Sequence, residues 1–256
     1  RLDIGNKMKN KLKQYIKYGY IPDYKQLSND INFMTYMDLV RIDGIGPMKA
    51  KRMMDVYNLN SINDLIRLVN MKKIVLPEES YYGLKYYTDL NTPIKRTFIK
   101  DIETNLKKHI PSKNFMIAGS YRRGKKYSND IDLVIKIKDE KHKKLISTKL
   151  KKIYPGEVIK EGKERLVIFA KIKKQKVKID VRFSTEKEWP FMVLYYTGSK
   201  LFNQKMRYHA KNMGYLLNQK GLYNRLTGKK VKNLNSEKAI FEFLEWEYIK
   251  PQDRNV

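Results

Sequence analysis

The sequence contains no cysteine, so disulfide bonds, zinc–thiolate sites and cysteine nucleophiles are all excluded. No stretch approaches the roughly 18 uninterrupted apolar residues that a membrane span needs, so no membrane partner is expected. The first residues, Arg-Leu-Asp-Ile, lack the apolar core of a secretory signal, and nothing indicates secretion. Because the chain begins without methionine, we expect a fragment or a processed form.

Acidic residues are scarce, since 27 Asp and Glu stand against 55 Lys and Arg and leave a net charge of +28. A cation this large attracts polyanions from a distance and releases counterions when it binds them. Nucleic-acid binding is therefore favoured, and a lysine-rich surface that only keeps the protein in solution is the alternative. Membrane-surface binding is less favoured, because the sequence has no basic amphipathic helix with a strong apolar face.

The N-terminal part of the sequence has the spacing of short helices. Apolar residues recur at helical intervals over residues 7–18, and Gly19 can end that helix. Residues 29–70 have the pattern of short helices separated by turns. Thr92 is a candidate N-cap for a long helix over residues 93–109, with proline at its first position.

The pattern changes to that of a sheet in the middle of the chain. Apolar and polar residues alternate from about Phe115 to Phe183, most clearly in three runs at residues 130–138, 165–172 and 177–183. Helical spacing returns afterwards, and the last helix is expected over residues 236–248. Helices, a sheet and a mixed tail in this order predict an α+β chain built of several small modules.

Residues 39–53 fit a helix-hairpin-helix, in which two short helices are joined by the turn Gly44-Ile45-Gly46. The glycines permit backbone angles that other residues resist, and they let the backbone approach a phosphate closely. The N–H groups that begin the second helix face such an anion, and positive charge is added there by Lys49, Lys51 and Arg52. These contacts would position a duplex without reading its sequence. The alternative is an ordinary helix turn with a glycine stop.

Two carboxylates stand two residues apart in the run Asp130-Ile131-Asp132. On a strand, both would point to one face while the intervening apolar residues point into the core. Two oxygen ligands on one face can hold a hard cation such as Mg²⁺. Taken alone, the pattern is more often a solvated strand face than a metal site.

A third carboxylate, Asp180, lies on the polar face of a later alternating run, together with Lys178 and Arg182. If the two strands are neighbours, three carboxylates meet, and their burial without a counter-ion would be costly. Two divalent metals roughly 3.5–4 Å apart would explain the cluster by clamping the attacking and leaving oxygens of an in-line displacement. Asp180 is then the candidate for drawing the proton from the attacking hydroxyl, directly or through a metal.

The turn Gly119-Ser120 supplies the other half of such a site, because it ends a predicted strand and opens a helix. Its backbone N–H groups, the Ser120 hydroxyl and Arg123 can hold a triphosphate. Together with the three aspartates, this turn indicates phosphoryl transfer from a nucleoside triphosphate, with catalysis by positioning and charge. The combination predicts a nucleotidyltransferase.

These motifs resemble those of the family X DNA polymerases, the group that includes DNA polymerase beta. Residues 119–123 with Asp130 and Asp132 are similar to the signature of the family's catalytic palm. Residues 195–199, Tyr-Tyr-Thr-Gly-Ser, are similar to the element at its nucleotide pocket, and residues 246–254 resemble the end of polymerase beta. The similarity spans nearly the whole chain and is clearest from Leu39 onward.

The resemblance implies an α+β fold with a helical DNA-binding module, a palm with a mixed sheet, and a small α+β nucleotide-selecting subdomain. The expected divisions are residues 1–28 as a remnant of an N-terminal lyase-like domain, 29–91 as the helix-hairpin-helix subdomain that binds duplex DNA, 92–184 as the palm, and 185–256 as the nucleotide- and template-binding subdomain.

The resemblance also implies roles for individual residues. The catalytic and metal-binding side chains are Asp130, Asp132 and Asp180. The nucleotide is bound by Gly119, Ser120, Arg123, Ser128, Asn129, Tyr195, Tyr196, Gly198, Lys200 and Asn203. Tyr195 bars a 2′-hydroxyl. DNA is contacted by Gly44, Gly46, Lys49, Lys51, Arg52, Lys178, Arg182 and Arg207. A Na⁺ or K⁺ ion is held at the hairpin by the carbonyls of Val40, Ile42 and Ile45.

Several positions depart from the family pattern. Asn129 replaces a common glycine, Lys178 an arginine beside the third aspartate, and Lys200 an acidic residue near the incoming base. Lys7 and Lys11 match positions at the end of the lyase domain, but so short a remnant cannot enclose a reactive amine. We therefore expect no useful lyase activity.

The implied activity is that of a template-dependent DNA polymerase, which adds dNTPs to a primer 3′-hydroxyl in the short gaps of base excision repair. It would use two Mg²⁺ ions, replaceable by Mn²⁺, on gapped or nicked duplex DNA. We expect an intracellular monomer, in the nucleus or at a viral or cytoplasmic replication site. Segments 138–165 and 173–176 look too short for the insertion that frees terminal transferases from a template. An RNA-directed nucleotidyltransferase and a catalytically dead DNA-binding scaffold are the alternatives.

Overall fold

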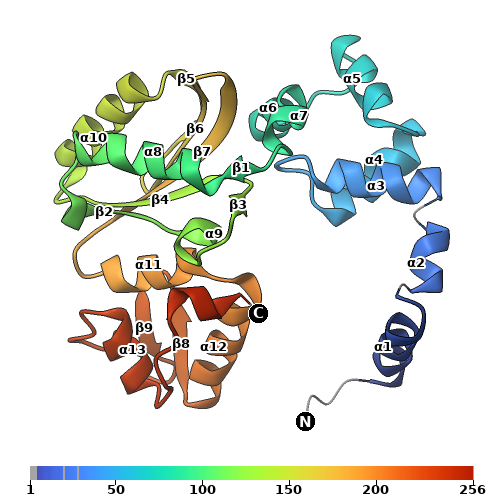
Figure 1. Cartoon of the computed structure of the whole chain (residues 1–256). Coiled ribbons are helices and arrows are strands. Elements are labelled where there is room, and N and C mark those ends of the chain that lie inside the picture. The colour runs from blue at the N-terminus through green and yellow to red at the C-terminus, as the bar shows by residue number, and fades with distance from the viewer. Residues whose placement is uncertain (1–4, 20, 28, 256) are drawn as a thin grey trace. The chain divides into compact units, whose positions relative to one another are not determined.

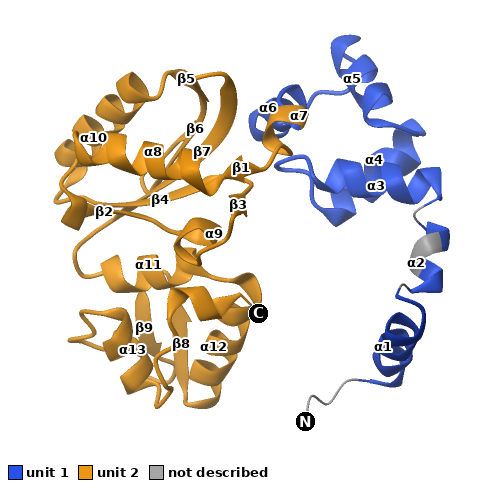
Figure 2. Ribbon diagram, in the orientation of Figure 1, with its two compact units in different colours: residues 1–87 blue, residues 88–256 orange. Residues whose placement is uncertain are grey.

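The computed structural model describes residues 5–19, 21–27 and 29–255. The chain forms two compact units, residues 1–87 and residues 88–256 (Figure 2). Each unit has apolar clusters of its own, so each is held together by its own burial of apolar surface. In the described part of the chain, no helix has both the length and the apolar character to cross a membrane.

Unit 1 is helical. Its helices are α1 (Asn6–Tyr18), α2 (Pro22–Leu27), α3 (Ile31–Val40), α4 (Pro47–Tyr57), α5 (Ile62–Asn70) and α6 (Glu78–Lys85), and α7 (Tyr87–Leu90) crosses into unit 2. The predicted first helix is confirmed, and Gly19 ends it in the left-handed conformation. No residue of α1 is buried, whereas α3 to α6 enclose a core around Leu39, Ile42 and Leu65.

Unit 2 is built on a five-stranded sheet, which confirms the mixed α+β fold. The strand order is β2-β4-β7-β6-β5, comprising β2 (Phe115–Ile117), β4 (Ile131–Lys136), β7 (Gln175–Ser184), β6 (Arg165–Ile172) and β5 (Gly156–Glu161). β4 and β7 are parallel and the other pairs are antiparallel. The three predicted strand runs correspond to β4, β6 and β7.

Helices cover the sheet on both faces (Figure 1). Apolar residues of α8 (Arg96–Lys107) and α10 (Glu140–Ile153) share one core with Ile131, Leu133 and Ile135 of β4. On the other face, α11 (Trp189–Thr197) packs Met192 and Val193 against Val134. The alternation along β4 thus places a helix on each side of the sheet.

The C-terminal part of unit 2 has its own core. It consists of α11, α12 (Lys200–Asn212), the hairpin β8 (Tyr215–Asn218) and β9 (Gly221–Asn224), α13 (Glu237–Phe243), and a 3₁₀ turn at Pro251–Arg254. Phe202 of α12 stacks on Phe241 of α13 and on Trp246, with ring centroids about 6 Å apart. Aromatic packing therefore holds the helices against the hairpin.

Two predicted helices differ from the observed ones. The helix expected over residues 93–109 begins at Arg96, because Ile94–Lys95 (β1) pairs with Tyr127–Ser128 (β3). Thr92 is therefore not its N-cap, and its hydroxyl donates to the carbonyl of Thr88. The last helix is α13, which is shorter than expected and is capped by Ser236.

Candidate active site

The two carboxylate strands are neighbours, as the sequence predicts. In the parallel pair β4–β7, Asp132 stands directly opposite Asp180. Asp130 lies in the bend before Ile131 rather than on the strand itself. Within the described residues, no group of three Asp, Glu, His or Cys side chains is arranged as a ready metal site.

The Asp180 carboxylate, only 8% exposed, is engaged by two arginines. Arg165 donates from Nε to Oδ1 at 3.1 Å and from Nη2 to Oδ2 at 2.7 Å, which is a two-point fork. Arg182 donates to Oδ2 at 3.2 Å, and its guanidinium lies 4.8 Å from the centre of the Tyr196 ring. The buried charge is therefore compensated, as a buried carboxylate requires.

Arg165 is a residue that sequence reasoning missed. It begins β6, and its partner across the antiparallel pair is Arg182 on β7. The alternating pattern predicts a strand at Arg165 but does not reveal which strand lies beside it. Its contact with Asp180 depends on that pairing alone.

Asp132 forms no ion pair of this kind among the described residues, and the charges of Lys178 and Arg182 compensate it only in part. Burial raises the pKa of its carboxyl well above the usual range, and the negative charges of Asp130 and Asp180 raise it further. Positive charge placed among these oxygens would reverse that effect. Oxygen-only donors crowded in this way are the ligands that hard divalent cations prefer, so the three side chains fit the metals that family membership would imply.

Gly119 lies directly against Asp132. A Cβ at this position would stand 2.0 Å from Oδ2 of Asp132, and the backbone has φ +55°. Only glycine allows both the close approach and the left-handed conformation without strain. The short helix α9 (Gly119–Arg122) therefore begins in contact with the carboxylate.

A cavity of about 410 Å³ opens beside these two residues. It is lined by Gly119, Ser120, Arg123, Lys125, Tyr127, Ser128, Asn129, Asp130, Asp132, Tyr195, Tyr196, Gly198, Lys200 and Asn203. The structure thus brings together all ten predicted nucleotide-binding residues with two of the three aspartates. Lys125 and Tyr127 were missed, although the basic run after Gly124 hinted at the first. Asp180 lies beside Asp132 on the neighbouring strand and is not among the residues that line the cavity.

One wall of the cavity is the turn around α9. The Ser120 hydroxyl donates to that of Ser128 at 2.7 Å. Arg123 donates from Nη1 to the carbonyl of Thr197 at 2.5 Å and from Nε to Asn255 at 2.9 Å. Burial lowers the pKa of Arg123. These contacts tie the α9 turn to the C-terminal helices.

The opposite wall comes from α11 and α12. The rings of Tyr195 and Tyr196 meet edge to face with centroids 5.2 Å apart. The Asn203 side chain donates to the Tyr195 carbonyl at 2.7 Å, which fixes the end of α11 against α12. Arg207 lies one turn further along α12, outside the cavity lining, with its guanidinium 5.8 Å from the Tyr195 ring centre.

In unit 1, the structure has a turn between two helices where the sequence predicts a hairpin. Helices α3 and α4 flank the turn, Gly44 has φ 78°, and a Cβ there would meet Ser80 Oγ at 2.7 Å. Lys49 is turned inward and donates to Ser80 Oγ at 3.2 Å and to the Gly44 carbonyl at 3.4 Å. Solvent-exposed positive charge comes from Lys51 and Arg52.

The two remaining groups of predicted residues stay predictions. The Ile42 carbonyl accepts a hydrogen bond from the Ile45 N–H at 3.0 Å, so any cation there would use its second lone pair. Lys7 and Lys11 are both exposed on α1, which has no buried residue.

Comparison with known proteins assigns both parts of unit 2 to the same class of enzyme, the nucleotidyltransferases. One part matches a palm and the other a thumb. Residues 95–188 match the family model for the DNA polymerase beta palm, and residues 192–255 match the one for the DNA polymerase beta thumb. The chain belongs to the family X DNA polymerases.

Relatives of this chain come from viruses, plants and animals. Repair DNA polymerase X of African swine fever virus (isolate Tick/South Africa/Pretoriuskop Pr4/1996) is 32% identical over 153 residues, covering 57% of this chain and 83% of the viral protein. DNA polymerase lambda of Arabidopsis thaliana is 24% identical over 289 residues, and DNA nucleotidylexotransferase of Xenopus laevis is 22% identical over 302. The plant and frog alignments each cover 99% of this chain. The chain spans 52% of the length of the plant protein and 58% of that of the frog protein.

Proposed function

We propose that this protein is a template-dependent DNA polymerase that adds dNTPs to a primer 3′-hydroxyl in short gaps, as base excision repair requires. The observation that supports this most is the pairing of Asp132 with Asp180 next to a cavity of about 410 Å³. That cavity combines acidic residues with the basic side chains Arg123, Lys125 and Lys200, so it suits a triphosphate held between metals and cations.

The proposed metal ligands are Asp130, Asp132 and Asp180, holding two Mg²⁺ ions that Mn²⁺ can replace. When bound, such ions supply the positive charge that stabilises the attacking and leaving oxygens. Asp180 is proposed to draw the proton from the primer hydroxyl. Each of its oxygens has two lone pairs, so hydrogen bonds from Arg165 and Arg182 leave acceptor capacity for that proton.

The proposed nucleotide contacts follow the two walls of the cavity. On the α9 side, Ser120, Arg123 and Ser128 hold the phosphates, with the backbone of Gly119 and Asn129. On the other side, Tyr195 excludes a 2′-hydroxyl beside Tyr196 and Gly198, while Lys200 and Asn203 face the base. Arg123 is already oriented at the cavity by Thr197 and Asn255, so little rearrangement is needed for it to bind.

The proposed DNA contacts lie on both units. The hairpin of unit 1 binds the duplex backbone through Gly44, Gly46, Lys49, Lys51 and Arg52, and a Na⁺ or K⁺ ion bound by Val40, Ile42 and Ile45 assists it. In unit 2, further contacts are proposed for Lys178, Arg182 and Arg207. The proposed divisions remain residues 1–28, 29–91, 92–184 and 185–256, acting as a monomer without lyase activity.

The test is primer extension on a one-nucleotide gapped duplex with Mg²⁺ and single dNTPs, run beside Asp180→Ala and Asp180→Asn. We expect only the template-matched nucleotide to be added, and both variants to be silent while they still bind the gapped DNA. Binding without incorporation by the unmodified protein would favour the scaffold alternative, and equal use of rNTPs would favour an RNA-directed enzyme.

Template dependence needs a separate experiment, because one relative is a DNA nucleotidylexotransferase. A single-stranded primer with all four dNTPs, in Mg²⁺ and then in Mn²⁺, should remain unextended. Extension of that primer at a rate close to that on the gapped duplex would replace the template-dependent proposal with an untemplated one.

A further inference from the structure

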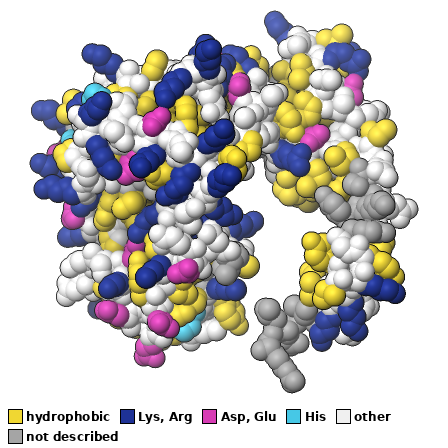
Figure 3. Space-filling view, viewed as in Figure 1, with side chains coloured by type: hydrophobic (Ala, Val, Ile, Leu, Met, Phe, Trp, Pro, Cys, Tyr) yellow, Lys and Arg dark blue, Asp and Glu magenta, His cyan; other side chains and the backbone are white. Residues whose placement is uncertain are grey.

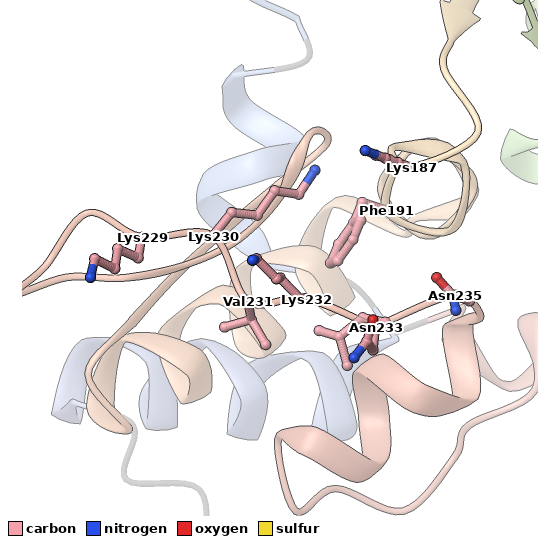
Figure 4. Close-up of a pocket in the computed structure, with 9 residues that line it drawn as sticks. Lys187, Phe191, Lys229, Lys230, Val231, Lys232, Asn233 and Asn235 are labelled. Atoms are coloured by element: carbon pink, nitrogen blue, oxygen red, sulfur yellow. The ribbon is translucent and has the colours of Figure 1, made fainter.

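Unit 2 contains a second cavity, of about 700 Å³, that does not include the carboxylates (Figure 4). It lies between the N-terminal end of α11 and the segment that follows β9, and it is lined by Lys187, Phe191, Lys229, Lys230, Val231, Lys232, Asn233, Leu234 and Asn235. Four of these side chains are lysines and none is acidic. The polymerase proposal assigns nothing to this place.

Most of the lysines around the cavity form no ion pair with any residue that the structure describes. None of the ion pairs among the described residues involves Lys187, Lys229 or Lys232, which are all exposed. Two nearby carboxylates are already engaged, Glu186 by Lys136 and Glu164 by Lys220. Uncompensated ammonium groups around a hollow attract anions. On the face of unit 2 drawn in Figure 3, Lys and Arg also outnumber Asp and Glu.

Lys230 is held in place within this group. Its ammonium donates to the carbonyl of Lys220 at 2.5 Å and lies 5.5 Å from the centre of the Phe191 ring. Figure 4 shows Lys187 and Lys230 pointing toward one another on the side where Phe191 lies. Two cations therefore converge above an apolar floor formed by Phe191, Val231 and Leu234.

This lining matches the chemistry of an unpaired nucleotide. Its phosphates would meet the lysines, its base edge the amides of Asn233 and Asn235, and its base face the apolar floor. A duplex is a poorer match, because its bases are stacked inside and only its phosphates are available. The volume lies within the range of about 300–1,000 Å³ that is usual for ligand pockets.

The cavity is also within reach of the predicted nucleotide site. Phe191, which lines the cavity, precedes Tyr195 by four residues of α11, and at about 1.5 Å per residue this places them roughly 6 Å apart along the helix axis. At the ~3.4 Å per nucleotide of a stacked strand, about two nucleotides would span this distance.

We propose that the lysine cavity binds the phosphodiester backbone of a single DNA strand, namely the unpaired stretch of the substrate beside the active site. That the strand is part of the substrate rests on the proposed polymerase function. Strand binding by the cavity does not, so it can be measured without any catalysis.

The test is the affinity for a fluorescent single-stranded oligonucleotide, measured by anisotropy over a range of salt concentrations. The variant carries Lys187→Gln, Lys229→Gln and Lys232→Gln. The control carries Lys141→Gln, Lys144→Gln and Lys152→Gln, three exposed lysines of α10. Both lose the same charge, so a difference between them reports the cavity.

We expect the cavity variant to bind about tenfold more weakly and its salt slope to fall by about 2, since each lost phosphate contact on a single strand removes about 0.7. The control should change by less than about twofold. Equal losses in the two variants would overturn the proposal, because charge alone would then explain the binding.

Two further measurements identify the source of the phosphate. Inorganic tripolyphosphate should displace the oligonucleotide only at much higher concentration than unlabelled strand does. Equal competition would show a site for free polyphosphate and overturn strand binding.

In primer extension, the variant should show a raised KM for substrates with a long unpaired template and an unchanged kcat. An unmodified protein that binds the strand but extends nothing would sink the polymerase proposal and leave the cavity intact.

Discussion

The two ends of α11 lie beside two different arrangements of charge. At its C-terminal end, the cavity proposed to bind the nucleotide combines Asp130 and Asp132 with basic residues, and Asp180 lies on the strand beside Asp132 with two arginines. At its N-terminal end, the lysine cavity has cations and no carboxylate. The first arrangement sets carboxylates beside cations, whereas the second has only cations and attracts a phosphate directly. Mixed charge is thus suited to chemistry on a phosphate, and charge of one sign to holding it.

The largest expected effect separates these two ends. Asp132→Asn removes a proposed metal ligand, so incorporation on gapped DNA should fall at least about a thousandfold. Because the buried carboxylate is destabilised by Asp130 and Asp180, the metal-free variant should also unfold at a temperature a few degrees higher. Single-strand binding should not change. Weaker strand binding by Asp132→Asn would show that the two ends are not independent.

The second expected effect concerns the buried ion pairs of Glu237 in the C-terminal part of unit 2. Glu237 of α13 pairs with Arg122 at 2.5 Å and with the fully buried Arg254 at 2.8 Å. Glu237→Gln would leave both guanidinium groups without their counter-charge, so the free energy of unfolding should fall by about 3 kcal/mol or more. Chemical denaturation measures this, and Glu242→Gln, an exposed position on the same helix, is the control.

The same residue predicts a pH dependence. Burial by itself would raise the pKa of Glu237, but hydrogen bonds and charge from Arg122 and Arg254 outweigh it and lower the pKa. The folded pKa therefore lies below the unfolded value of about 4.3, and the stabilisation is present above that value and is lost as the pH falls through the folded pKa. Denaturation midpoints of Glu237→Gln should not show this loss. A parallel decline in both proteins would contradict the assignment.

A third, smaller effect should disturb only the carboxylate end. Gly119→Ala places a Cβ against Asp132, so kcat should fall about a hundredfold as the ligand is displaced. Its matched control is Gly214→Ala, where φ is +84° but no atom lies within 4 Å of the added Cβ. Both changes cost about 1–2 kcal/mol of backbone strain, to which the clash with Asp132 adds at Gly119 alone, and only Gly119→Ala should lose activity. Equal activities would mean that the contact with Asp132 is unimportant.

The smallest expected effect contrasts the lysine cavity with the hairpin of unit 1. Lys51→Gln with Arg52→Gln should weaken binding of fully duplex DNA severalfold and lower its salt slope by about 1.8, since each duplex phosphate contact is worth about 0.9. Single-strand affinity should hardly change. The cavity variant should show the reverse preference, and identical profiles for the two variants would mean that neither surface discriminates between strands and duplexes.

Sequence patterns predicted what depends on local spacing. The alternation around Asp132 and Asp180, the glycine that ends α1 and the turn between α3 and α4 were all visible, because each reflects a period or a backbone angle. Pairing across the chain was less visible. Ile94–Lys95 reads as the start of a helix until β3 is there to pair with it.

The candidate site shows the same division. All ten expected nucleotide-binding residues line one cavity, and the resemblance of the motifs was enough to identify them. Arg165 could not be identified in this way, because its contact with Asp180 depends on a strand register that no local pattern contains. The lysine cavity was not foreseen either. Its lysines come from two distant segments, and in a chain with 55 Lys and Arg the individual residues do not stand out.

The parallel pairing of β4 with β7 has a consequence for synthesis of the protein. Between the two strands the chain makes α10, β5 and β6, and β7 then inserts between β4 and β6. Asp180 therefore reaches Asp132 only when the last strand of the sheet enters its centre. Contacts of such long sequence separation form late in folding. A nascent chain that has not yet completed β7 accordingly has no assembled carboxylate centre.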